Sequence, residues 1–191
     1  MPTLKNTSLF ATAALGLALM SGCSSEQPGQ PVPSTGGTSI SQTSSANAST
    51  GQDETLAAIK PCDLLTAQEA AQFKAQGPGQ VGDTQASGST SACGWHGRTA
   101  DDNSVSFGVD IRATQGIDEL RANGGTVTDG KVNSHAARQL QTVNGGCILS
   151  LRVGPKSRVD ISVVADNAAQ SCQIASDIAN IIEPKLPPEA N

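Results

Sequence analysis

Aromatic side chains are scarce in this sequence, because its 191 residues include three Phe, one Trp and no Tyr. So few rings disfavour base-stacking platforms for nucleic acids and aromatic cages for ligands. Basic side chains are also a minority, with 12 Lys and Arg against 17 Asp and Glu and a net charge of −5. Nucleic-acid-binding domains usually carry a basic patch or stripe. The composition therefore predicts no nucleic-acid partner.

Common catalytic and metal-binding motifs are missing as well. The sequence contains no C-x-x-C, H-E-x-x-H or G-x-S-x-G, which are signals for redox or zinc sites and for serine hydrolases. Gly77–Gly82 matches G-x-G-x-x-G, but it follows a predicted helix and precedes none, so we interpret it as a flexible loop. Asp101–Asn103 lacks the other ligands of a calcium loop. We expect His96 and His135 to be surface or hydrogen-bonding residues, and we predict no catalytic residue, metal or cofactor.

Residues 1–22 are typical of a lipoprotein signal peptide. Lys5 supplies a short positive segment, and the apolar run Leu9–Met20 is too short for a membrane span. The run ends at Leu19-Met20-Ser21-Gly22-Cys23, where small residues precede a Cys, and this resembles the bacterial lipobox. By that resemblance, a diacylglyceryl group with fatty acyl chains such as palmitate is attached to the Cys23 thiol, and the signal is cut before it. The alternative is an ordinary signal peptide with cleavage nearby.

A lipidated Cys23 would hold the protein at the extracytoplasmic face of the cell membrane. One acyl chain binds a membrane only marginally, whereas two chains hold it stably. The segment after Cys23 consists mainly of Ser, Thr, Gly, Gln and Pro, and it has too few apolar side chains to form a core. We therefore predict a lipidated Cys and a disordered Ser/Thr/Gly/Pro tether over residues 23–54.

The composition changes near Thr55, and apolar residues recur with recognisable periods over residues 55–187, before a tail at 188–191. The residues from Val105 to Ile111 alternate between apolar and small or polar, which predicts a half-buried strand. In chain order, the patterns first predict a helix capped by Thr66 and Glu69, a polar loop over 79–90, strands over 92–95 and 105–111, and a short helix over 116–123. Two hairpins follow, one turning at Asp129-Gly130 and a second of 140–143 and 147–153 turning at Asn144-Gly145. The last elements are a strand over 159–163 and a helix through Ile174 to Ile182 that ends at Pro184.

Short turns between consecutive strands require antiparallel pairing, because parallel strands need long crossover connections. We therefore predict an α+β domain in which helices pack on one face of an antiparallel sheet. Trp95, the only Trp, adjoins Cys93, and we expect it to pack in the core against a disulfide.

Four cysteines remain once Cys23 is assigned to the anchor: Cys62, Cys93, Cys147 and Cys172. An even number outside the cytoplasm implies two disulfides. Of the three pairings, we favour Cys62–Cys93 and Cys147–Cys172. The first would join the start of the capped helix to the Trp95 strand, and the second would join a sheet strand to the terminal helix. Each closes a loop of about 30 residues, worth roughly 3–4 kcal/mol in the chain-entropy model.

Several short motifs, taken in their order and spacing, resemble a known family. They are Pro61-Cys62-Asp63-Leu64-Leu65-Thr66 with Glu69-Ala70, Cys93-Gly94-Trp95, Gly146-Cys147 opening a strand, and Cys172 with Ala175 on the last helix. Over about residues 55–187, the chain resembles actinobacterial lipoproteins catalogued as domain of unknown function 3558. The resemblance implies a secreted, lipid-anchored, disulfide-bonded α+β domain with no established activity and no catalytic residue to carry over. A more distant similarity to extracellular sensor domains of actinobacterial receptor kinases implies a sensor-like or binding fold.

The leading functional hypothesis is a non-enzymatic envelope lipoprotein whose tethered domain binds a partner protein, a glycan or a small ligand. The alternative is a carrier of lipid or another hydrophobic ligand, which requires an apolar cavity between sheet and helix. A cryptic hydrolase is the third hypothesis.

Overall fold

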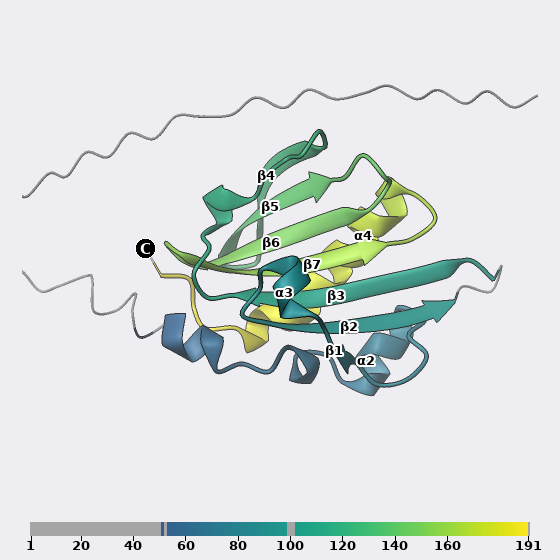
Figure 1. Ribbon diagram of the computed structural model, residues 1–191, viewed down its shortest axis with the longest axis horizontal. Coiled ribbons are helices and arrows are strands. Elements are labelled where there is room, and N and C mark those ends of the chain that lie inside the picture. The colour runs from purple at the N-terminus through teal and green to yellow at the C-terminus, as the bar shows by residue number, and fades with distance from the viewer. Residues whose placement is uncertain (1–50, 52, 99–101, 191) are drawn as a thin grey trace, which may run out of the picture. The chain divides into compact units, whose positions relative to one another are not determined.

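The sheet is antiparallel throughout the part of the chain that the computed structural model describes, residues 51, 53–98 and 102–190. Within these residues it has seven strands, in the order β1-β2-β3-β7-β6-β5-β4 (Figure 1). The strands are β1 (Gln80–Val81), β2 (Ser91–Arg98), β3 (Ser104–Arg112), β4 (Thr126–Val132), β5 (His135–Gln141), β6 (Cys147–Gly154) and β7 (Ser157–Val164). The helices are η1 (Pro61–Asp63), α2 (Ala67–Gln72), α3 (Thr84–Ser87), η2 (Ile117–Glu119), α4 (Ala168–Ile182) and η3 (Glu183–Lys185), and residues 51 and 53–57 are also helical. The predicted α+β class is confirmed.

Alternation along the strands gives the sheet two unlike faces. In β3 the predicted pattern is confirmed, because Val109 and Ile111 are fully buried while Ser106 and Asp110 on the other side are partly exposed. The apolar side packs against α4 and η1, and we call it the covered face. The opposite side, which carries Gly94, Ser106 and Asp110, is called the open face. The short helix α3 lies in front of the sheet there in Figure 1.

The terminal helix α4 begins at Ala168, so Cys172 lies in its first turns as expected, although the apolar pattern becomes visible only from Ile174. Asn167 caps it by accepting a hydrogen bond from the Gln170 amide at 3.0 Å. Its first turns bury small residues rather than isoleucines, so the apolar pattern in the sequence starts too late. Ile178 and Ile182 are fully buried, as predicted, and Pro184 marks the change to η3.

The capping box of α2 is confirmed. The Glu69 amide donates to Thr66 Oγ1 at 3.1 Å, and the Thr66 amide donates to Glu69 Oε2 at 2.7 Å. These two bonds satisfy amides that the first turn of a helix leaves without partners. The Lys185 ammonium, beyond α4, also contacts the Glu69 carboxylate at 2.9 Å and so links the two ends of the domain.

Both predicted disulfides are present, Cys62–Cys93 and Cys147–Cys172. The predicted core position of Trp95 is also confirmed, since its side chain is 2% exposed and stacks on Phe107 with ring centroids 5.4 Å apart. Gly79 lies so close to both features that a Cβ there would be 2.5 Å from Cys93 Sγ and 2.6 Å from Trp95 Cε2. Close approach to the disulfide therefore explains one glycine of the glycine-rich loop.

The predicted turn at Asp129-Gly130 is wrong. Both residues lie within β4, where Gly130 pairs with Ala137 of β5. The turn is formed by Asn133 and Ser134, next to the paired residues Val132 and His135. Asn133 has a φ of 47°, a conformation that Asn tolerates better than most residues, whereas Gly130 keeps a strand conformation.

Other boundaries also differ from the predictions. The predicted loop over 79–90 contains β1 and α3, and the Trp95 strand extends over all of β2. The predicted helix over 116–123 is only the single turn η2. The strand predicted at 140–143 starts at His135 and ends at Gln141, although the turn at Asn144-Gly145 is confirmed by the positive φ of Gly145, 81°.

Candidate functional site

On the open face, four neighbouring strands contribute one residue each to a row, and three of the four residues are Gly or Ser. Gly94 of β2 lies opposite Gly108 of β3. Gly108 lies in turn opposite Ser162 of β7, and Ser162 opposite Ile148 of β6. With no side chain on two successive strands, the sheet backbone itself is accessible. The row therefore forms the floor of a depression.

The depression has a volume of about 390 Å³, and we call it the glycine hollow. Gly94, Gly108, Ser162 and Ile148 form its floor, and Asp83, His96, Asp110, Thr142 and Val164 are among the residues around it. A Cβ placed on Gly94 would meet nothing closer than the Phe107 carbonyl oxygen, at 3.9 Å. The space above this glycine is thus open.

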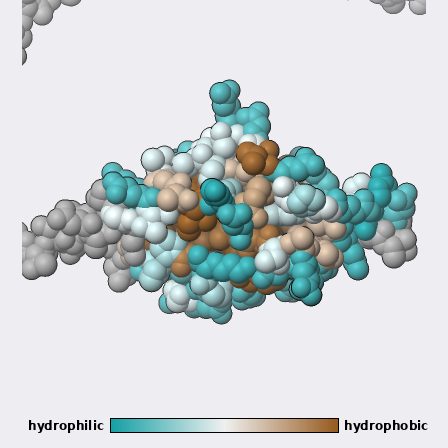
Figure 2. Space-filling model, turned by 90° about the horizontal axis from the view of Figure 1, so that it is seen from below, coloured by the Kyte–Doolittle hydropathy of each residue, from teal (hydrophilic) through white to brown (hydrophobic). Residues whose placement is uncertain are grey.

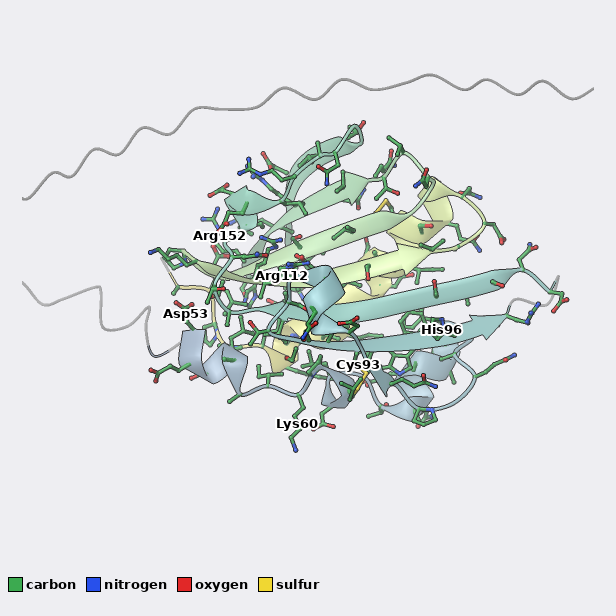
Figure 3. The ribbon with its side chains drawn as sticks, viewed as in Figure 1. Asp53, Lys60, Cys93, His96, Arg112 and Arg152 are labelled. Atoms are coloured by element: carbon green, nitrogen blue, oxygen red, sulfur yellow. A yellow bond between two sulfur atoms is a disulfide. The ribbon has the colours of Figure 1, made fainter. Side chains whose placement is uncertain are left out.

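The rim of the hollow is partly apolar. Val164 is 55% exposed, and Val81, next to the lining residue Gly82, is 85% exposed. Figure 2, which views the molecule from the side of β1 and β2, shows hydrophobic groups between hydrophilic margins on this side. His96 projects from β2 beside the hollow (Figure 3).

Next to the hollow, a buried charge network fixes the segments that lie over the open face. Asp160 of β7 is 5% exposed and accepts hydrogen bonds from Arg112 Nε at 2.5 Å and from Arg158 Nε at 2.8 Å. Ser150 also donates to Asp160, at 2.5 Å. Both arginines bond beyond the sheet, because Arg112 donates to the Ser87 carbonyl at the end of α3 and Arg158 donates to the Gly116 carbonyl before η2. The label of Arg112 beside α3 marks this place in Figure 3.

Asp110 lies between this network and the hollow. It is the register partner of Asp160 on the adjacent strand. Burial raises the pKa of Asp110 above its ordinary value, and the charge of Asp160 adds to the rise, while hydrogen bonds from Ser89 and Ser87 and the charge of Arg112 oppose it without cancelling it. The carboxylate is therefore poorly solvated in the free protein and would gain from a positively charged neighbour.

A Ser, a His and a carboxylate do meet elsewhere, at Ser134, His135 and Glu183, but their geometry is not that of an activated nucleophile. His135 Nε2 faces the Pro187 carbonyl at 2.9 Å and so donates to it, while Nδ1 lies 2.6 Å from Glu183 Oε1. The Ser134 hydroxyl donates to the same Glu183 oxygen at 2.7 Å. The Pro187 carbonyl receives the Nε2 bond, and the Glu183 carboxylate receives the Ser134 hydroxyl and faces Nδ1. Nδ1 also lies 3.3 Å from Ser134 Oγ, but the hydroxyl donates to Glu183 and not to the ring. The group fastens the C-terminal segment to β5.

The residues that the sequence singled out are placed as follows. The four cysteines of the domain are structural, and Cys23 lies outside the described residues, as does most of the predicted tether. His135 is buried and hydrogen-bonded, and Asp102 forms an exposed ion pair with Arg98 at 2.9 Å. Within the described residues, no group of three or more His, Cys, Asp or Glu side chains is arranged to hold a metal ion.

Sequence reasoning missed the glycine hollow. Its signal was Gly94 and Gly108, which stand at open-face positions of two strands, where glycine weakens a strand and often marks the close approach of another group. Each glycine alone is unremarkable, and only the register of β2 with β3 brings the two together.

Comparison with known proteins identifies a family. The family described as "Protein of unknown function (DUF3558)" matches residues 18–185. Neither the curated proteins nor the solved structures include a match to this chain. In the part of the chain that the structure describes, no helix has the length and apolar character needed to cross a membrane.

Proposed function

The chain belongs to the DUF3558 family of proteins of unknown function, and on this premise we propose that it is a non-enzymatic binding domain. The domain is held at the extracytoplasmic face of a bacterial cell membrane by a lipid on Cys23, with the segment up to residue 54 as a tether. Two features support the proposal: the lipobox-like sequence before Cys23, and a domain with two disulfides, which are typical of oxidising compartments.

The glycine hollow is the observation that carries the binding role. Its volume of about 390 Å³ lies within the range of about 300–1,000 Å³ that is typical of small-molecule sites. Its floor of glycine lets a ligand approach the sheet backbone, and ionisable side chains stand only around its margin. We propose that the hollow is the site at which the domain binds its ligand or the group presented by a partner.

The carrier alternative has less support. A carrier needs an apolar cavity between the sheet and α4, but side chains fill that space: Leu151, Ile161 and Ile178 are fully buried there. A second groove, of about 290 Å³, lies between α4 and the β4–β5 hairpin. Polar residues such as Gln139, Ser176 and Asn180 line much of it, which does not suit a hydrocarbon chain.

The anchor is tested by metabolic labelling with an alkyne analogue of palmitate. We expect the protein to take up the label and its mature N-terminal peptide to start at Cys23 with a diacylglyceryl group. Cys23→Ala should abolish labelling, because the acceptor thiol is lost, whereas Ser24→Ala should keep it. A mature protein whose first residue is not Cys23 would show that the signal is an ordinary one.

The binding role is tested by photo-crosslinking in cells that produce the protein. A photoreactive amino acid replaces Val164, which is 55% exposed at the rim of the hollow, or Gln173, which is exposed on α4 across the sheet. We expect a discrete crosslinked species, identified by mass spectrometry, from position 164 and not from position 173. The same products from both positions, or none from position 164, would contradict a binding site in the hollow.

A further inference from the structure

We infer that the glycine hollow selects an organic cation, namely an ammonium group attached to a short apolar body. The inference rests on the proposed binding role and names the class of ligand. It is based on the uneven distribution of charge around the hollow and on the glycine-rich floor, which favours an apolar group.

The acidic residues around the hollow are not matched by basic ones. Asp83 and Asp110 line it, and within the described residues no Lys or Arg does. The nearby Arg112 is already engaged by Asp160, by Gln115 at 2.7 Å and by the Ser87 carbonyl at 2.9 Å. The guanidinium holds α3 in place, and its charge also acts on Asp110, but it does not itself line the hollow, where Asp83 and Asp110 stand against no lysine or arginine of the described residues. A cation entering beside Asp110 meets attraction, and an anion meets repulsion.

The other ionisable side chain at the hollow, His96, lies away from Asp110. Asp110 pairs with Ala92, and His96 lies four residues further along β2, which is about 13 Å at about 3.3 Å per residue. The hollow therefore offers a small ligand a negative end at Asp110 and an uncharged middle. The middle is formed by Gly94, Gly108 and the side chain of Ile148, and Val164 stands at its edge.

This floor suits an apolar group better than a polar one. The glycines present Cα atoms without side chains, and Ile148 and Val164 add methyl groups that are not fully buried in the free domain. Covering such surface is favourable in proportion to the apolar area removed from water. An alkyl body resting on the floor, with its ammonium group at Asp110, uses both features at once.

The test titrates three six-carbon probes, hexylammonium, 1-hexanol and hexanoate, into the full chain carrying Cys23→Ser so that no acyl group interferes. Backbone amide shifts are followed by NMR at pH 7. We expect hexylammonium to move the amide signals of Gly94, Gly108 and Gly146 at concentrations where hexanoate does not, with 1-hexanol between the two. Gly130, in β4 at the far edge of the sheet, should not move and serves as an internal reference.

Two variants, each with a matched control, test separately what the open floor and the charge of Asp110 contribute to binding. Gly94→Val places methyl groups in the hollow and should abolish the shifts with every probe, because a Cβ at this position has room and its extensions occupy the ligand's space. Gly130→Val, where a Cβ meets nothing within 4 Å, is the matched control and should leave binding unchanged. Asp110→Asn should weaken hexylammonium binding at least about tenfold, because a charged partner is lost, and should leave 1-hexanol unaffected. Asp177→Asn, an exposed carboxylate on α4, should change neither.

Each outcome decides one part of the inference. If hexanoate or 1-hexanol shifts the same glycines as strongly as hexylammonium, the hollow remains a binding site but selection for a cation is overturned. If hexylammonium binds equally well to the Asp110→Asn variant, the assigned role of that carboxylate is wrong. If no probe moves these glycines, the organic-cation inference fails, and the proposed binding role is then decided by the crosslinking at position 164.

Discussion

Replacing Asp160 with Ala should lower the free energy of unfolding by about 3–5 kcal/mol, the range found when one partner of a buried ion pair is removed. Asp160 is 5% exposed and is the shared acceptor of two arginines, Arg112 and Arg158, which are themselves 15% and 5% exposed. Without the carboxylate, two buried positive charges lie side by side and the Ser150 hydroxyl loses its acceptor. The loss follows mainly from the uncompensated charges rather than from the missing contacts.

Chemical denaturation of the purified domain with intact disulfides measures this loss. Asp129→Ala is the control, because Asp129 also pairs with an arginine, Arg138 at 2.7 Å, but is 74% exposed. Exposed ion pairs contribute about 0–1 kcal/mol, so this variant should remain close to the parent. A similar loss in both variants would show that burial of the Asp160 network is not what makes it stabilising.

The same variant should also loosen the segments over the open face. Arg112 and Arg158 reach from Asp160 to the carbonyl groups of Ser87 and Gly116, so both tethers depend on their shared acceptor. Hydrogen exchange should therefore accelerate at 81–90 and 113–120 while α4 keeps its protection. Because Asp83 and Asp110 line the hollow next to α3, the network also determines the shape of the proposed site.

Local patterns in the sequence predicted much of the fold. The alternation from Val105 to Ile111 predicted a strand and its buried side, since burial requires every second residue to be apolar. Thr66 and Glu69 predicted the start of a helix, because the two bonds of a capping box depend only on residues three positions apart. The disulfides followed from an even cysteine count together with the elements that those cysteines occupy.

The incorrect predictions arose where a local sequence pattern is compatible with two different structures. Asp129-Gly130 is a frequent hairpin turn, yet the chain turns four residues later, because pairing of β4 with β5 places Lys131 opposite Ala136 and continues to Val132. All residues of β4 except the last are at least partly exposed. This edge strand therefore buries few apolar side chains, and the sequence pattern that would indicate a strand is weak. The turn itself then depends on whether Asn133 takes a positive φ.

The site was not predictable for a different reason. Arg112 and Asp160 are 48 residues apart in the chain, and their contact exists only because β7 is inserted between β3 and β6. The same insertion places Ser162 beside Gly108 and so completes the floor of the hollow. Strand order in an antiparallel sheet is a global property, and the short turns in this sequence restrict it without determining it.

Replacing Glu183 with Gln should remove a large part of the acid sensitivity of the fold. Glu183 is 5% exposed, and burial alone would raise its pKa, but hydrogen bonds from Ser134, His135 and Asn133 outweigh burial and lower the pKa from 4.5 to about 2. The folded state therefore holds the carboxylate ionised more strongly than the unfolded chain does. This contribution to stability is fully present above pH 4.5 and is lost as the pH falls through about 2.

The expected size of this effect follows from the two pKa values. A tenfold change in proton affinity corresponds to about 1.4 kcal/mol, so the ionised Glu183 contributes about 3 kcal/mol at neutral pH. The pKa values of two other carboxylates also depart from their ordinary values. The backbone hydrogen bond with Thr66 lowers the pKa of Glu69, so Glu69 adds a loss of the same sign on acidification. The raised pKa of Asp110 acts in the opposite direction, because its protonation favours the folded state.

Denaturation curves between pH 7 and pH 2 separate these contributions. The parent should lose stability steeply below pH 4.5, whereas Glu183→Gln should start about 3 kcal/mol lower at pH 7 and lose about that much less on acidification, so that the two curves converge near pH 2. Glu54→Gln, which changes an exposed carboxylate, should follow the parent throughout. Parallel curves for the parent and Glu183→Gln would mean that the bonds from β5 stabilise Glu183 equally in both protonation states. Convergence would instead establish that the bonds to Glu183 stabilise the fold through the charged form of this carboxylate.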